Sequence, residues 1–534
     1  MEETERNLRE KIEQEAKNTL KKTMWEGYAN DILTGLQKNP GVQPDRPIWE
    51  LVQNARDVAY ENKKAKIVFI RKQDHFVFQH NGQPFTRTTL QSLILQTSSK
   101  VREDIIQVGQ YGTGFLTTHK FGLDFRLSGS LSLLEGLKFY NFSGRDFIIK
   151  RSAQDKVKLS DDLDATIAKT QQWGLDLNSL EDNPRRETIF EYQHNFNAER
   201  ENAKIAIKEA PKLVPYVLAL NKHIESISFI DEVEGPKEES FTFQNEEIYD
   251  NLENLRVYET TILHSQSGQK DKIISLFLLK SLRCLEEKTG ESKFTIILPL
   301  KKISEGLKVF NFDNSIPRLY LYLPLLGSKD WGCNFLFHSP SFTCDQDSRD
   351  SIMLRFNPQA EVHHDQINKD IIREASDALK KYLTYKYLNL TDARFLCPIN
   401  FVKGKSDNET NQYYQELQKE WVSFFECLNL VEYEDGKTIP VKSIRVLSNE
   451  LYLACEQDVS LLDTIYNLLS KAVHLILPRK EELLFWSKVI NEWYEDNEAE
   501  NLHIISIDSL VSLIQETTIT ESDLDWLHKL FYYF

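Results

Sequence analysis

The chain has 534 residues, and its 81 acidic side chains outnumber its 65 Lys and Arg side chains, giving a formal net charge of −16. Such an acidic balance argues against a surface built mainly for nucleic acid or anionic lipid. There is no run of about 18 apolar residues and no signal-peptide segment, so we expect no membrane partner. The six cysteines are scattered without a CxxC pair, which indicates reduced thiols in a cytoplasmic protein.

The first 205 residues predict a domain in which helices pack on a sheet, an α/β sandwich of α+β type. Apolar spacing and turn residues give the expected elements in chain order: a charged helix at 4–37, a loop at 39–47, a helix at 48–60, strands at 66–72 and 75–82, a short helix at 88–99, a glycine-rich turn at 108–115 followed by a helix, and strands at 138–152 and 185–193.

Two further regions follow. Residues 206–390 predict a mixed α/β middle domain with several strands, which closes on a long amphipathic helix at 367–388. Residues 391–534 predict a mostly helical region. Its aromatic side chains are expected in a helical core; they include Trp421, Trp486, Trp493 and Trp526. The abrupt end at "LDWLHKLFYYF" suggests a piece of a longer chain.

The helix at 48–60, "IWELVQNARDVAY", carries a polar face beside its apolar stripe. Glu50, Asn54 and Asp57 recur at intervals of four and three residues and therefore share one side of the helix. A solvated face is one interpretation. The other is a site, because an Asn oxygen suits Mg²⁺ and a carboxylate one turn earlier can take a proton from an attacking water.

A glycine-rich turn, "VGQYGTGF", contains Gly109, Gly112 and Gly114 in a GxxGxG spacing. Glycines allow close approach of the backbone to an anion, and a following helix points free N–H groups at it. By itself the pattern is a weak signal for phosphate binding and favours a structural turn. Between the two motifs, Gly82 would let a base ring approach the backbone, and Lys100 in "TSSK" could reach a phosphate.

Taken in order, these motifs resemble the GHKL superfamily of ATPases, which share the Bergerat nucleotide-binding fold. "ELVQNARD" and "VGQYGTGF" are similar to its first box and its glycine box, and "RRETIFEY" is similar to the strand that carries a phosphate-steadying Thr, here Thr188. The overall pattern resembles sacsin-type and heat-shock-ninety-type ATP-binding modules. The segment 323–353 is similar to one in the second domain of sacsin-type modules.

The resemblance implies ATP and Mg²⁺ as cofactors and assigns roles to residues. Glu50 would be the general base, Asn54 the Mg²⁺ ligand, and Asp57 would hold water or the ribose side. The phosphates would be held by Gly109, Gly112, Gly114, Lys100 and Thr188. The superfamily normally has an Asp that accepts from the adenine amino group, whereas this sequence has His80, followed by Asn81 and Gly82. Recognition of adenine therefore stays open.

A cation from the second domain normally completes such a site. Arg349 is the first candidate for this catalytic role, and Lys301 or Lys302 is the second. A salt bridge of Arg349 with a neighbouring aspartate is the alternative interpretation. The adjacent His363 and His364 predict no metal site, because no further ligand cluster accompanies them.

The expected function is an ATP-binding and ATP-hydrolysing, chaperone-like conformational switch. Mg-ATP would close a lid at residues 83–108 and favour a homodimer through residues 1–37, with an unidentified protein client. The alternative is a nucleotide-binding scaffold or sensor with little hydrolysis, for example in bacterial antiviral defence. A DNA-repair-like role is disfavoured, because it predicts a basic groove and salt-sensitive DNA binding.

Overall fold

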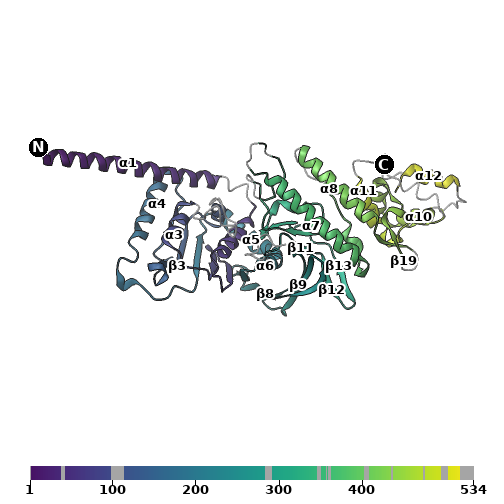
Figure 1. The fold of residues 1–534 in the computed structure, drawn as a ribbon, viewed down its shortest axis with the longest axis horizontal. Helices are drawn as coiled ribbons and strands as arrows, with labels where there is room; N and C mark the ends of the chain where they lie inside the picture. The colour runs from purple at the N-terminus through teal and green to yellow at the C-terminus, as the bar shows by residue number, and fades with distance from the viewer. Residues whose placement is uncertain are drawn as a thin grey trace. The chain divides into compact units, whose positions relative to one another are not determined.

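The computed structural model describes residues 2–37, 43–97, 114–282, 291–345, 350–356, 358, 362–401, 408–433, 437–472, 475–494 and 503–516. The chain forms two compact units. Unit 1 comprises Met1–Glu246, Thr260–Ser275 and Tyr322–Pro324, and unit 2 comprises Glu247–Glu259, Leu276–Leu321 and Leu325–Phe534. Figure 1 labels the helices and strands by which the two units are described below.

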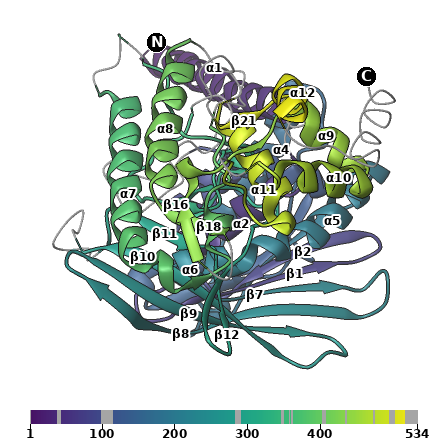
Figure 2. The same ribbon diagram turned by 90° about the vertical axis from the view of Figure 1, so that its right-hand side faces the viewer.

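Unit 1 is built on a mixed β-sheet. Its strands are β1 (Ala65–Arg71), β2 (His75–His80), β3 (Phe125–Leu133), β4 (Lys138–Phe142), β5 (Ile148–Ile149), β6 (Thr188–Gln193), β7 (Ile224–Asp231), the start of β8 (Lys237–Leu252) and β15 (Leu323–Pro324). The main order is β8–β7–β1–β2–β6–β3–β4, with β5 beside β3. β1 and β7 run parallel, while β1–β2, β2–β6 and β3–β6 are antiparallel. Figure 2 shows β1, β2 and β7 side by side.

One face of this sheet is buried under helices. The helices of unit 1 are α1 (Glu2–Gln37), α2 (Arg46–Asp57), α3 (Arg87–Leu95), α4 (Lys156–Gln171), α5 (Asn197–Glu209), α6 (Val214–Leu220) and the 3-10 helix η2 (Gly114–Phe121). The buried face is aromatic, and the ring of Phe69 lies 5.4 Å from the rings of both Phe78 and Phe229. Such burial is the main source of stability for a sheet of this kind.

Local sequence explains where the helices of unit 1 begin. The Asp155 side chain accepts from the Val157 N–H at 2.6 Å and so caps α4, and Thr86 and Thr89 form a capping box at α3. α2 has Pro47 in its first turn, where a missing N–H costs nothing. The long helix α1 lies along α4 (Figure 1) and is held there by the pair Lys21–Asp164 at 2.9 Å.

The mixed α/β class is confirmed, and most predicted elements of unit 1 are present. The helices expected at 4–37, 48–60 and 88–99 are α1, α2 and α3, and the paired strands at 66–72 and 75–82 are β1 and β2. The helix expected after the glycine turn is a 3-10 helix, η2. β3 and α4 were not predicted. In β3, Gly129 weakens the strand signal, yet a Cβ there would lie 3.3 Å from the Phe142 ring.

Unit 2 combines short strands with long helices. Its strands include β11 (Thr295–Leu298), β12 (Leu300–Ile303), β13 (Gly306–Val309), β14 (Leu319–Leu321), β16 (Leu336–His338), β17 (Leu390–Thr391), β18 (Asn429–Tyr433), β19 (Lys437–Pro440), β20 (Val446–Leu447) and β21 (Ile504–Ile505). β9 (Leu255–Gln266) and β10 (Lys272–Ser281), like β8, have residues in both units.

The helices of unit 2 are α7 (His364–Lys386), α8 (Asn408–Glu426), α9 (Asn449–Gln457), α10 (Val459–Leu469), α11 (Lys480–Trp493) and α12 (Ile507–Glu516). α7 and α8 lie side by side (Figures 1 and 2), and Lys380 pairs with Glu420 across them at 3.5 Å. Trp421, Trp486 and Trp493 are buried, which confirms the predicted helical core, while Trp526 lies outside the described residues.

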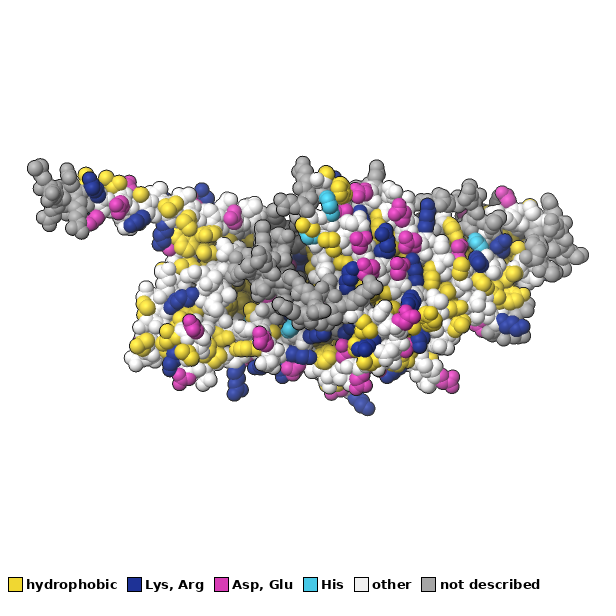
Figure 3. Space-filling model, in the orientation of Figure 1, with side chains coloured by type: hydrophobic (Ala, Val, Ile, Leu, Met, Phe, Trp, Pro, Cys, Tyr) yellow, Lys and Arg dark blue, Asp and Glu magenta, His cyan; other side chains and the backbone are white. Residues whose placement is uncertain are grey.

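The described ranges can be compared with the expectations for cysteines, membrane-spanning helices and surface charge. The five described cysteines are free thiols, and three of them are buried. No helix in these ranges is long and apolar enough to cross a membrane. On the face of the molecule drawn in Figure 3, Lys and Arg side chains are interspersed with Asp and Glu.

Candidate functional site

The sequence predicts the site on the polar face of α2, and the apolar face of the same helix is anchored in the core. Ile48, Leu51, Val52 and Ala55 are fully buried on the opposite side of the helix. Glu50 and Asn54 are half-buried. The side-chain amide of Asn54 has no hydrogen-bond partner within the described ranges. A half-buried amide without a partner is available to a ligand.

Gly114, the last glycine of the glycine-rich turn, lies directly against Glu50. A Cβ placed on Gly114 would stand 2.7 Å from the carboxyl carbon Cδ of Glu50 and 2.9 Å from its Oε1. Real Cβ atoms do not approach other atoms so closely, so only glycine fits here without displacing the carboxylate. Glu50 and Gly114, which are 64 residues apart in the sequence, therefore bring the two motifs into contact.

The Glu50 carboxylate is also held from its own helix. Arg46, one turn earlier, approaches Oε1 of Glu50 with its guanidinium at 3.6 Å, and both side chains are largely buried. The i, i+4 spacing of Arg46 and Glu50 is the sequence signal for this pair, and sequence analysis missed it. An arginine beside the carboxylate favours its charged form, which is the form able to accept a proton.

The far end of α2 meets the end of strand β2. Gly82 packs against Val58, the residue after α2, because a Cβ at Gly82 would lie 2.6 Å from Val58 Cγ2 and 2.9 Å from the Val58 carbonyl. The Gln83 N–H donates to that carbonyl at 2.7 Å. Glu50 and Val58 are eight residues apart, so the two ends of the face are separated by about 12 Å along the helix.

His80 and Thr188 line this second end from the sheet. They are register partners on β2 and β6, and both are buried. The His80 ring lies 5.3 Å from the ring of Phe78 and 6.3 Å from the ring of Phe190. The Gly82 N–H donates to Nδ1 of His80 at 3.1 Å. Burial lowers the pKa of His80 to about 4, so the imidazole is neutral at pH 7.

Two predicted site residues have structural partners. Oδ1 of Asn81 accepts the Lys66 N–H of β1 at 2.7 Å, and its Nδ2 donates to the Lys64 carbonyl at 3.4 Å. Asp57 lies 3.4 Å from the Arg56 guanidinium. That buried guanidinium stacks 3.8 Å from the centre of the Tyr322 ring. Both side chains therefore hold the ends of β1 and α2 in place.

Other predicted residues fall outside this geometry. Lys100, Gly109, Gly112 and Arg349 lie outside the described residues, as does part of the proposed lid, 98–108. Lys301 and Lys302 are exposed on β12, and Lys302 pairs with Glu259 at 2.6 Å. Nothing in unit 1 as described identifies the cation that would complete the site.

A preformed metal cluster is not part of this geometry. Across the described ranges, no three His, Cys, Asp or Glu side chains are grouped to hold an ion. His364 instead shares a hydrogen bond with Thr343 at 3.1 Å. His119, buried in η2, points its Nδ1 at the Gly122 carbonyl at 3.3 Å, as expected for a core histidine.

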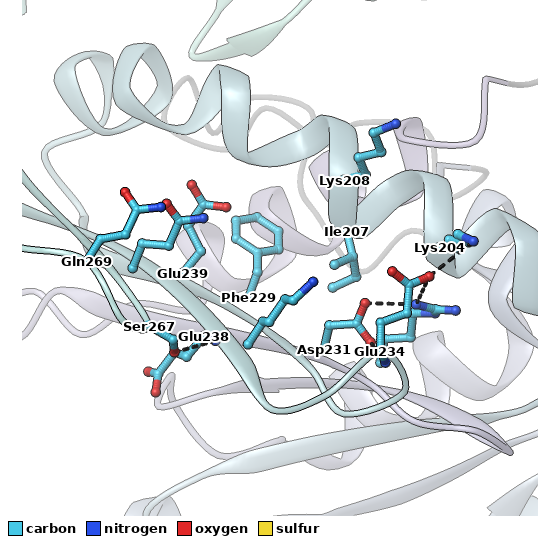
Figure 4. Close-up of a pocket in the computed structure, with 13 residues that line it drawn as sticks. Lys204, Ile207, Lys208, Phe229, Asp231, Glu234, Glu238, Glu239, Ser267 and Gln269 are labelled. Carbon is cyan, nitrogen blue, oxygen red and sulfur yellow. Dashed lines mark hydrogen bonds and ion pairs between the residues drawn. The ribbon is translucent and has the colours of Figure 1, made fainter.

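Unit 1 also has a cavity of about 390 Å³ between α5 and the β7–β8 hairpin (Figure 4). Its charged side chains largely neutralise one another. Arg71 pairs with Asp231 at 2.8 Å, and Glu234 accepts from Lys204 at 3.1 Å. Figure 4 shows these pairs at one end of the cavity, with Phe229 and Glu239 farther along it. Because these charges are already compensated, the cavity offers a ligand less than the α2 face does.

Comparison with known sequences adds no family to this description: neither the protein-family models nor the curated proteins include a match to the chain.

The contact between Gly114 and Glu50 makes a stability prediction. Gly114→Ala should lower the apparent melting temperature modestly, because the new methyl group displaces the end of the flexible Glu50 side chain from its place beside Arg46. Removing the carboxylate should relieve the strain. A thermal double-mutant cycle with Glu50→Ala should therefore show a double variant less destabilised than the sum of the single variants.

Gly27→Ala is the matched control, because nothing lies within 4 Å of a Cβ at that helical position. It should leave the melting temperature unchanged or raise it. Additive effects of Gly114→Ala and Glu50→Ala would show that the two residues are not in contact.

Buried His80 makes the protein acid-sensitive. Its pKa is about 4 when folded and about 6.5 when unfolded. Between these values the unfolded state binds the extra proton, so stability is fully present above about pH 6.5 and falls as the pH drops towards 4. From pH 7 to pH 5 this one group should cost about 2 kcal/mol.

The measurement is urea denaturation at pH 7 and pH 5 for the native chain and for His80→Phe, which keeps a ring between Phe78 and Phe190. The variant should lose less stability on acidification than the native chain. The exposed His363→Phe serves as the control. Equal losses in the native chain and in His80→Phe would refute a buried neutral His80.

Proposed function

We propose that unit 1 is a Bergerat-type nucleotide-binding domain that binds a nucleoside triphosphate with Mg²⁺ and hydrolyses its terminal phosphate. ATP is the ligand that the sequence resemblance implies. The observation that carries the proposal is the packing of Gly114 on the Glu50 carboxylate. It joins a backbone able to approach phosphate oxygens to a carboxylate able to accept a proton.

The fold supports the proposal at a coarser level. A mixed sheet carries helices on one face. Gly114 at the start of η2 packs on Glu50 of α2, and Gly82 after β2 packs on Val58 after α2. His80 of β2 is in turn the register partner of Thr188 of β6. Carboxylate, amide, glycine and threonine are the types that the resemblance asks for at these positions. Along α2, Glu50 marks the proposed phosphate end of the site. Val58, the residue after the helix, marks the proposed base end.

The residues present fit Mg²⁺ and triphosphate. Asn54 has an amide without a partner in the described ranges, midway between the two ends of the face, and its oxygen would serve as the protein ligand of the ion. When bound, Mg²⁺ would offset the negative charge of the phosphates. The space that a side chain at Gly114 would fill is taken by the Glu50 carboxylate, so glycine at this position lets that carboxylate reach the start of η2.

The chain's own groups then account for the chemistry. Glu50 orients a water molecule and accepts its proton as the water attacks the terminal phosphate in line; the bond from that phosphorus to the bridging oxygen breaks, and the nucleoside diphosphate leaves. Arg46 lies beside the carboxylate and helps to hold it in position. Thr188 is the first residue of β6 and the register partner of His80 at the other end of the face, so the phosphate role that the resemblance implies for its hydroxyl is not part of this mechanism. The sheet and the buried side of α2 hold these groups rigidly, which is what catalysis by positioning requires.

Glu50→Gln tests this assignment. The amide keeps the size of the side chain but cannot accept the proton, so the rate of phosphate release should fall by about a hundredfold or more. Binding of the nucleotide should persist. Steady-state phosphate release and fluorescence titration of a labelled nucleotide would measure the two quantities separately.

The exposed Glu61→Gln is the matched control and should hydrolyse at the native rate. Equal rates in the native chain and in Glu50→Gln, with binding retained, would remove Glu50 from catalysis and favour the scaffold or sensor alternative.

A further inference from the structure

At the end of β2, a backbone hydrogen bond to the His80 ring determines which ring nitrogen can donate. Nδ1 of His80 is used as an acceptor, because it receives the Gly82 N–H at 3.1 Å. A neutral imidazole has one acceptor nitrogen and one donor nitrogen. The ring is neutral at pH 7 because burial holds the pKa of His80 near 4. Its single proton must therefore be on Nε2, which makes His80 a donor towards any ligand.

Three acceptors around the end of β2 each already receive one hydrogen bond. The Val58 carbonyl receives the Gln83 N–H at 2.7 Å, and the Ala59 carbonyl receives the Gln83 side-chain amide at 3.1 Å. Oδ1 of Asn81 receives the Lys66 N–H at 2.7 Å. At Nε2 of His80 itself, an exocyclic amino group would meet a donor, whereas a carbonyl oxygen would accept the Nε2 hydrogen.

We propose that His80 selects nucleoside triphosphates whose base presents a carbonyl oxygen to Nε2, a 6-oxopurine such as guanine or hypoxanthine, in preference to adenine. This inference rests on the proposed function, since it names the ligand class of the same site. A site built to satisfy one hydrogen bond discriminates strongly against a ligand that leaves the partners unpaired. His80 is thus a specificity-determining residue rather than a catalytic one.

Inosine triphosphate and ATP form a matched ligand pair, because they differ only at the six-position and the adjoining ring nitrogen. Equilibrium titration of the full chain with each magnesium complex should give inosine triphosphate the lower Kd by about tenfold or more. GTP should bind like inosine triphosphate if the two-amino group is tolerated. An equal Kd for the pair, or tighter binding of ATP, would overturn the inference.

Two substitutions test whether His80 is responsible. His80→Asp replaces the donor by an acceptor and should reverse the preference towards ATP. His80→Phe keeps the ring but removes both nitrogens, so the two Kd values should approach each other within about threefold. The phenylalanine variant decides the matter if the aspartate variant does not fold. A native-like preference in folded His80→Phe would overturn the assignment.

Controls separate this inference from the proposed function. His75→Asn changes a half-exposed histidine at the start of β2 and should leave the preference unchanged. Magnesium tripolyphosphate, which has no base, probes the phosphate end alone. If it binds and the base preference is absent, only the His80 inference fails. If neither it nor any nucleotide binds, the proposed function fails and the inference fails with it.

Discussion

The close packing of the Gly114 backbone on the Glu50 carboxylate is the constraint on which the rest of the site depends. It fixes the start of η2 against the first turns of α2, and no residue larger than glycine fits at position 114 without moving the carboxylate. Arg46 holds the same carboxylate from within α2. A group held from two sides keeps its orientation without a ligand, which is the preorganisation that electrostatic catalysis needs.

The stability of this arrangement comes from the sheet beneath it. The aromatic side chains of β1, β2 and β7 stack on one another, and the apolar side of α2 closes over part of the same core. His80 continues the line of Phe78 along β2, so the residue that we propose to face the base is also part of the core. The same burial therefore keeps His80 neutral and fixes which of its nitrogens has the proton. Packing and recognition are coupled at this residue.

Much of unit 1 could be predicted from the sequence because its signals are local. The 3.6-residue period of α2 and the alternation in β1 and β2 each identify their elements. β3 was missed because Gly129 and several serines weaken its pattern, although the strand lies between β6 and β4. The sharing of β8, β9 and β10 between the two units also could not be predicted from the sequence. The chain passes from one unit to the other several times, whereas a prediction from sequence assigns one continuous segment to each domain.

The candidate site divides in the same way. The motifs and the resemblance pointed to α2, Gly114 and Thr188, since residue types and their spacing are visible in the sequence. Spacing could not show that Asn81 is bound to the β1 backbone, that Asp57 is paired with Arg56, or that Gly82 occupies Nδ1 of His80. Each of these facts depends on a contact with another element or on the local path of the backbone. Hydrogen-bond direction in particular is a property of the folded chain.

The central claim is that the polar face of α2 holds a magnesium-bound triphosphate through Asn54. Calorimetric titration with Mg²⁺ and ATP, and in parallel with Mg²⁺ and inosine triphosphate, tests it most directly. Asn54→Ala should weaken both ligands by about tenfold or more, because the role proposed for the lost oxygen is to contact the metal and not the base. Gln53→Ala, a neighbouring change on α2, should leave both affinities intact. Unchanged affinity in Asn54→Ala, or no binding by the native chain, would contradict the account.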